Sequence, residues 1–141
     1  VTWLTKLVNA HIAFPELGVI GIEVEAIKEQ IRLMTRSCEN GIESNLRLAT
    51  YNINGACFSI SQKTRSRFGP LTTYTKPYGF EDSAYCYMTK RGGVNNAYIY
   101  SESPILRQFP ENDKEYEEWK RISFEENRPE YTDWRSKYKG K

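Results

Sequence analysis

An apolar stripe between Ile20 and Cys38 constrains the fold more than any other stretch of this sequence. Its members recur at steps of four and three, which keeps them on one face of an α-helix; they are Ile20, Val24, Ile27, Ile31, Met34 and Cys38. Ile22, Ala26 and Leu33 form a second, smaller stripe on the opposite side of such a helix. The pattern therefore predicts a helix over Ile20–Cys38 that packs on a sheet on one side and on another element on the other.

Two other structures remain open for this stretch. Spacing of four and three is typical of a coiled coil, although the stretch is shorter than the three to four heptads that such a signal needs. The first residues, Val19 to Val24, also alternate and are rich in β-branched side chains, so a short strand that leads into a shorter helix is an alternative.

A first helix is predicted over residues 2–14. Thr2 can cap its N-terminus, and Pro15 ends it because the residue before a proline avoids the helical region. The connection to Ile20–Cys38 is short, so the two helices are expected to be neighbours, with the first covering the second apolar stripe.

After Gly41 the apolar period changes from about three and a half to two, which indicates strands. Asn54-Gly55 between two such runs predicts a β-hairpin, because both residues accept a positive φ. The expected strands cover residues 46–53, 56–62, 71–76, 83–90 and 96–100. Together these signals predict an α+β fold in which two N-terminal helices pack on an antiparallel sheet of about five strands in sequence order.

The last 35 residues differ from residues 1–106 and are predicted to form a separate C-terminal tail, 107–141. Its one aliphatic side chain is Ile122, so the tail cannot build its own core. Short helices are expected over residues 110–121 and 129–138, with aromatic residues that anchor them on this domain or on a partner. The candidate partner-binding residues are Tyr116, Trp119, Tyr131, Trp134, Tyr138, Ile22 and Leu33.

Basic charge gathers in the middle third of the chain, where residues 63–107 carry seven Lys or Arg and three Asp or Glu. Residues 63–70 are expected to form a basic loop, and Tyr85 and Tyr87 are expected to share one face of the sheet. Positive charge attracts phosphates and exposed aromatic rings stack on bases. The candidate nucleic-acid-binding residues are Lys63, Arg65, Arg67, Lys76, Tyr85, Tyr87, Lys90 and Arg91.

Common catalytic and metal-binding motifs are missing from the sequence. The chain has one histidine, His11, and three widely spaced cysteines, Cys38, Cys57 and Cys86. This set does not match a zinc site or a catalytic triad, and the glycines do not match a phosphate-binding loop. We expect no metal, no cofactor, no membrane span and no secretion, with free thiols in a reducing compartment such as the cytoplasm, an organelle matrix or a virion.

No motif specifies a function, so function is predicted from what remains. The first hypothesis is a non-enzymatic structural or interaction subunit of a larger assembly, either an organellar complex or a viral particle. The aromatic content, at 13% of residues, supports it, because aromatic side chains are enriched at interfaces. The second hypothesis is a small nucleic-acid-binding protein. The third is a small enzyme that acts on phosphodiesters.

Overall fold

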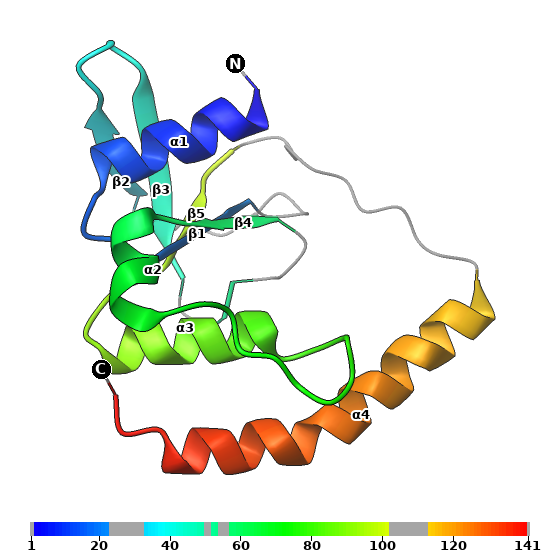
Figure 1. The fold of residues 1–141 in the computed structure, drawn as a ribbon. Helices are drawn as coiled ribbons and strands as arrows, with labels where there is room; N and C mark the ends of the chain where they lie inside the picture. Colours follow the sequence, from blue (N-terminus) through cyan, green and yellow to red (C-terminus); the bar gives the residue numbers. More distant parts are fainter. Residues whose placement is uncertain (1, 23–32, 50–51, 54–56, 102–112, 141) are drawn as a thin grey trace.

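The computed structural model describes residues 2–22, 33–49, 52–53, 57–101 and 113–140. Within these residues it has four helices and one five-stranded sheet, which confirms the predicted α+β class (Figure 1). In chain order the elements are α1 (Trp3–Ala13), β1 (Val19–Ile22), β2 (Leu33–Ser37), β3 (Glu43–Leu48), β4 (Phe58–Ile60), α2 (Gln62–Phe68), α3 (Glu81–Arg91), β5 (Ala97–Ile99) and α4 (Lys114–Lys137).

The sheet is mixed, with the strand order β2-β3-β5-β1-β4. β1 and β5 run parallel, while the pairs β2–β3, β3–β5 and β1–β4 are antiparallel. The predicted antiparallel sheet in sequence order is therefore wrong, although the number of strands agrees. The parallel pair places the short strands β1 and β5 in the middle of the sheet.

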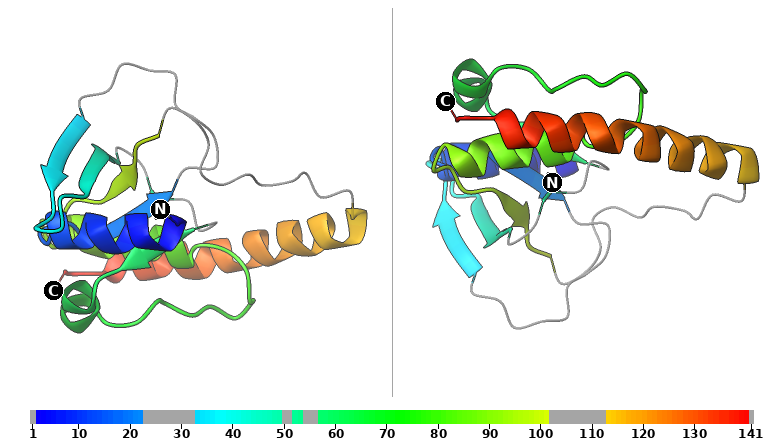
Figure 2. Two further views of the ribbon diagram at one scale, coloured as in Figure 1. Left: turned by 90° about the horizontal axis from the view of Figure 1, so that it is seen from above. Right: turned by 90° about the horizontal axis from the view of Figure 1, so that it is seen from below.

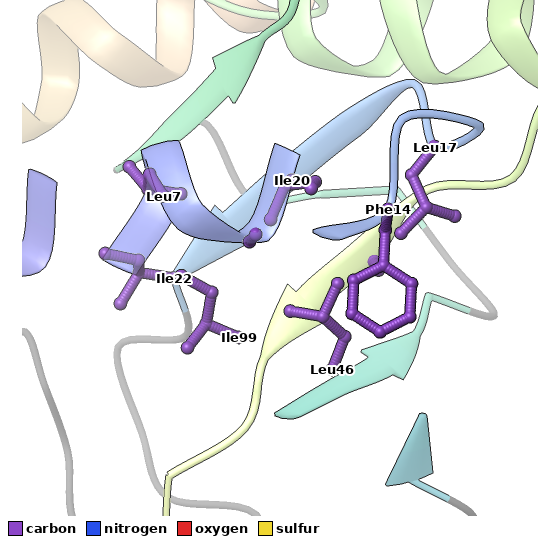
Figure 3. Packing of buried hydrophobic residues seen from close by; sticks show 9 residues of the cluster. Leu7, Phe14, Leu17, Ile20, Ile22, Leu46 and Ile99 are labelled. Atoms are coloured by element: carbon purple, nitrogen blue, oxygen red, sulfur yellow. The ribbon is translucent and has the colours of Figure 1, made fainter. Parts of the chain in front are cut away.

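The helices cover the two faces of the sheet unequally. Figures 1 and 2 show α1 on one face and α3 on the other, with α4 forming a further layer beyond α3. Side chains of β1 alternate accordingly: Ile20 and Ile22 pack with Leu7 and Phe14 on the α1 side (Figure 3), whereas Val19 packs on the α3 side. Among the described residues, one face of the sheet thus carries two helical layers and the other carries one.

The predicted helix over Ile20–Cys38 is wrong at both ends, where the structure has β1 and β2, and residues 23–32 lie outside the described part. The strand alternative for Val19–Val24 agrees with β1. A side chain would not fit at position 21 of β1, because a Cβ on Gly21 would overlap Cγ2 of Ile53 and lie 3.2 Å from the ring of Tyr98. Glycine lets Ile53 and the ring of Tyr98, on the neighbouring strand β5, approach the backbone of β1 closely.

The predicted hairpin between residues 46–53 and 56–62 is also wrong. β3 pairs with β2 and β5, whereas β4 pairs with β1, so the two strands are not partners. The turn residues Asn54-Gly55 themselves lie outside the described residues. Residues 63–68 of the predicted basic loop form part of helix α2, which the side chain of Ser61 caps. Residues 71–76, predicted as a strand, form neither helix nor strand.

Residues 83–90 were predicted as a strand and form most of helix α3. Glu81 and Asp82 lie in its first turn, and Lys90 and Arg91 in its last, which suits the partial charges of the two helix ends. The alternating Ala84, Cys86 and Met88 are all buried, but so are Tyr85 and Thr89, which fits a helix between two layers. The strand prediction for residues 96–100 agrees with β5.

The tail forms one long helix, α4, and the prediction of two short helices is wrong. Asp113 caps it, and Pro129 lies inside it. Tyr131 stacks on Phe80 with ring centroids 4.7 Å apart, so the second half of α4 packs on the chain's own α3 region. Among the described residues, no helix is both long and apolar enough to cross a membrane.

Candidate functional site

An exposed apolar stripe on α1 is the first candidate site. Leu4, Val8 and Ile12 follow one another at steps of four residues, and their exposed fractions are 56%, 50% and 60%. Trp3 adds an indole that is 47% exposed at the start of the same helix. The opposite side of α1 supplies Leu7 to the core. We call Leu4, Val8 and Ile12 the α1 stripe; Trp3 lies on the side of Leu7 and Ala10 and is not part of it.

The α1 stripe faces away from the sheet, on the side that carries a single helical layer. Exposed apolar residues are common singly, but a row on one helix side indicates a contact surface. Lys6 is the one Lys or Arg of α1, whereas helices that lie on membranes are usually rich in cations on their polar face. The surface therefore suits a protein partner better than a lipid.

Sequence reasoning missed the α1 stripe because it assigned this side of α1 to the second apolar stripe of the next predicted helix. Two residues of this second stripe, Ile22 and Leu33, were predicted to bind a partner. Ile22 is fully buried in the core and cannot contact a partner, while Leu33 on the edge strand β2 is 37% exposed. The breadth of the apolar arc on α1 was the available signal, since it exceeds what one buried face requires.

The aromatic residues of the tail divide into two groups. Tyr131, Trp134 and Tyr138 belong to or pack against clusters of this chain's own core. Tyr116 and Trp119 stack on each other 5.5 Å apart and remain 40% and 42% exposed. They lie on the N-terminal half of α4, which projects beyond the rest of the molecule (Figure 2).

A second candidate site lies where three helices end. Nη2 of Arg67, in the last turn of α2, donates to the carbonyl oxygen of Gly92 after α3 at 2.7 Å. The ring of Tyr138, at the end of α4, lies 6.0 Å from that of Tyr87 on α3. Figures 1 and 2 show the C-terminal ends of α2, α3 and α4 at the same end of the molecule.

This end of the molecule is rich in exposed cationic side chains. Four of them, Arg65, Arg67, Lys90 and Arg91, come from the predicted set, and α4 with the residues after it adds three that the sequence did not point to. We call the whole set the basic end; it comprises Arg65, Arg67, Lys90, Arg91, Arg135, Lys137 and Lys139.

An aromatic ring supports Arg135 in the basic end. The guanidinium of Arg135 lies 4.7 Å from the ring centroid of Tyr87, and the centroids of Trp134 and Tyr138 each lie 6.0 Å from that of Tyr87 in T-shaped arrangements. Burial raises the pKa of the Tyr138 phenol, and the nearby Arg67 and Arg91 act in the opposite direction. Basic residues in the last turn of a helix also stabilise that helix by interacting with its terminal carbonyl groups. This structural role applies to each helix separately and does not explain why three helix ends lie together.

The other predicted nucleic-acid-binding residues lie elsewhere or inside. Tyr85 is buried and its hydroxyl donates to the carbonyl of Gly69 at 3.0 Å, so it cannot stack on a base. Lys76 pairs with Glu126 of α4 at 3.0 Å, away from the helix ends. Lys63 is exposed at the start of α2.

His11 and Ser59 form the one Ser–His contact in the described residues, with Nε2 2.9 Å from Oγ. The hydroxyl of Ser59 donates to the carbonyl of Ile20 at 3.2 Å, so Nε2 must carry the proton and donate to Oγ. A protonated nitrogen cannot act as a base toward that hydroxyl, and Nδ1 is buried without a partner among the described residues. The pair ties α1 to β4 and does not form a catalytic dyad.

His11 should make the protein less stable in mild acid. Burial lowers its pKa in the folded state, with the contact to Ser59 acting in the opposite direction. Above about pH 6.5 both states are neutral at this ring, but below it the unfolded state takes up the proton first. The free energy of unfolding should fall between pH 6.5 and 5.5, by less than about 1.4 kcal/mol because the ring is only partly buried.

The measurement is urea unfolding at several pH values for the protein and for the His11→Gln variant. Gln can still donate to Ser59 but does not titrate. The difference in slope between the two proteins over this window should come from His11, and equal slopes would contradict the prediction.

The thiols offer little reactivity. All three cysteines are free, and burial raises the pKa of Cys86 to about 11. Cys38 lines an open hollow beside the end of α1, and its Sγ donates to the carbonyl oxygen of Asn9 at 3.3 Å. The described part of the chain contains no group of three or more His, Cys, Asp or Glu side chains that could hold a metal ion.

Comparison with known proteins adds no relative to this description. No family model, no curated protein and no solved structure matches the chain.

Proposed function

We propose that the protein is a non-enzymatic interaction subunit that docks on a protein partner through the α1 stripe. The observation that carries this proposal is the row of Leu4, Val8 and Ile12, each at least half exposed on the outermost helix of its side. An assembly in an organelle or a viral particle is consistent with such a surface.

The layer structure supports the same function. On the other face of the sheet, α3 is covered by α4, and the apolar residues between them are buried. On the α1 face nothing comparable among the described residues covers Leu4, Val8 and Ile12. Three anchors at steps of four residues span about 12 Å of helix, which matches an apolar groove or the side of another helix.

Replacing Val8 and Ile12 by glutamine should abolish retention of the partner with little change in stability. Both side chains are exposed in this chain, and glutamine keeps a good helix propensity, so the free energy of unfolding should change by less than about 1 kcal/mol. The matched control is Leu71→Gln with Ile122→Gln, which removes two apolar side chains, each 40% exposed, outside α1.

The measurement is co-purification from the native source with a tagged chain, quantified for the unaltered protein and both double variants. The proposal expects the partner proteins to be lost with the α1 variant and kept with the control. An identical set of partners in all three samples would contradict docking through α1.

A further inference from the structure

We infer that the basic end is a separate binding site for the phosphate backbone of double-stranded nucleic acid. It lies at the C-termini of α2, α3 and α4, whereas the α1 stripe lies on the opposite face of the sheet. The site therefore adds a second ligand to the protein and does not depend on the docking function of α1.

Positive charge is concentrated at the basic end. Seven cationic side chains, including Arg91 and Arg135, reach this end from three helices and the residues after α4, and Asp133, an acidic residue of α4, pairs with Lys137 at 2.7 Å. A surface of this kind attracts a polyanion, and arginine binds phosphate oxygens through two parallel N–H groups.

Two arginines of the basic end are held in place by their neighbours. Arg67 is held by the carbonyl of Gly92 and lies over the ring of Phe68 at 4.7 Å, and Arg135 lies over Tyr87 at the same distance. Cations held in place lose little conformational entropy on binding. A stiff duplex presents phosphates at fixed spacing, whereas a flexible single strand would have to be ordered on such a surface.

The aromatic rings at this end pack against other side chains of the protein. Proteins that bind single strands stack bases on open ring faces. Here Trp134 packs against Tyr131, Tyr138 and Tyr87 at centroid distances of 6.1, 5.2 and 6.0 Å, and Arg135 covers Tyr87. The rings thus support the cations and are not available as a platform for bases.

The exposed rings at the other end of α4 do not supply that platform either. Tyr116 and Trp119 stack on each other, and the carboxylates of Glu117 and Glu118 on the same turns pair with Lys120 and Arg121 at 2.8 and 2.6 Å. Acidic and basic side chains balance on these turns, so this surface lacks the excess of positive charge that attracts a single strand. Double-stranded nucleic acid is therefore the ligand that fits the described surface best.

The experiment is fluorescence anisotropy with labelled 20-base-pair duplex DNA, 20-base-pair duplex RNA, and single-stranded (dT)20, each at several salt concentrations. We expect at least one duplex to bind about tenfold more tightly than (dT)20 at equal salt. Changing Arg91 and Arg135 to glutamine should weaken duplex binding about 50-fold at 0.1 M salt and reduce the slope of log K against log salt by about two.

The matched control changes Lys6 and Lys114 to glutamine, which removes the same charge from the start of α1 and the start of α4. Its duplex affinity should change by less than about threefold. Equal losses in both variants would show a general charge effect and overturn the site.

A second readout tests the state of the rings. In a chain with Trp3 and Trp119 changed to phenylalanine, emission of the remaining Trp134 should not be quenched when nucleic acid is saturating. Equal or tighter binding of (dT)20, or quenching of Trp134 by it, would overturn the choice of duplex. Absence of binding to every probe at 20 mM salt would overturn the site, and the α1 proposal would stand.

Discussion

Replacing Phe14 by alanine should destabilise the protein by about 3–5 kcal/mol, the range for deleting a buried aromatic side chain. Phe14 ends α1, is 1% exposed, and packs with Leu46, Ile20 and Leu17 between the helix and the sheet (Figure 3). The substitution loses the transfer free energy of the ring and leaves a cavity that rigid neighbours cannot fill.

The Phe14 ring also supports a charged side chain at the edge of the core. The guanidinium of Arg36 on β2 lies 4.5 Å from the ring centroid, donates to the carbonyl oxygen of Ala13 at 3.2 Å and pairs with Glu16 at 2.7 Å. Phe14→Leu should restore most of the apolar volume but not this contact, so we expect a loss of less than half that of Phe14→Ala.

Urea unfolding followed by circular dichroism measures these differences, with Ile12→Ala as the control on the same helix. Ile12 is 60% exposed, so its loss should change the free energy of unfolding by less than about 0.5 kcal/mol. A loss at Ile12 as large as that at Phe14 would show that the assignment of the two sides of α1 is wrong.

Local signals explain why α1 could be predicted from the sequence. The side chain of Thr2 accepts a hydrogen bond from the backbone N–H of Thr5, and the helix ends just before Pro15, both as expected from the residues. Capping and proline effects act within a few positions along the chain, so they do not depend on what the helix packs against.

The stretch Ile20–Cys38 could not be predicted in the same way, because its strands take their pattern from tertiary contacts. All four residues of β1 are buried, so no apolar and polar alternation marks the strand. β2 is an edge strand and largely exposed, so it also lacks a clear pattern. Apolar residues of separate elements then coincided with a helical period.

The basic end could be predicted only in part for a related reason. Arg67, Lys90 and Arg91 could be predicted because they belong to residues 63–107, the basic middle third of the sequence. Arg135 and Lys137 join them through the packing of α4 on α3, and no local pattern of the tail specifies which surface it contacts. Residues brought together by docking of a distant helix require the tertiary structure.

The second large loss of stability is expected at Asn127, which holds α4 against the rest of the protein. This side chain is fully buried and makes three hydrogen bonds of 2.9 Å to the backbone of the loop between α2 and α3. Oδ1 accepts from the N–H of Lys76, and Nδ2 donates to the carbonyl oxygens of Lys76 and Tyr78. Asn127→Ala should destabilise the protein by about 3 kcal/mol, because buried backbone groups lose their partners.

The control on the same helix is Glu126→Gln, which removes the charge that pairs with Lys76 on the surface. That pair is about half exposed on both sides, so its loss should cost less than about 1 kcal/mol. Urea unfolding compares the two variants, and limited proteolysis between residues 70 and 80 reports whether the loop opens first. Equal stability of Asn127→Ala and Glu126→Gln would contradict the role given to Asn127.

The same variant connects the fold to the basic end. If Asn127 fixes α4 against the loop, its loss should increase the fraction of molecules in which α4 is undocked and Arg135 no longer lies over Tyr87. Duplex affinity of Asn127→Ala should then fall at temperatures where the sheet is still folded, while binding through the α1 stripe is kept. A parallel loss of both activities would instead indicate global unfolding, in which α4 and the sheet form one cooperative unit.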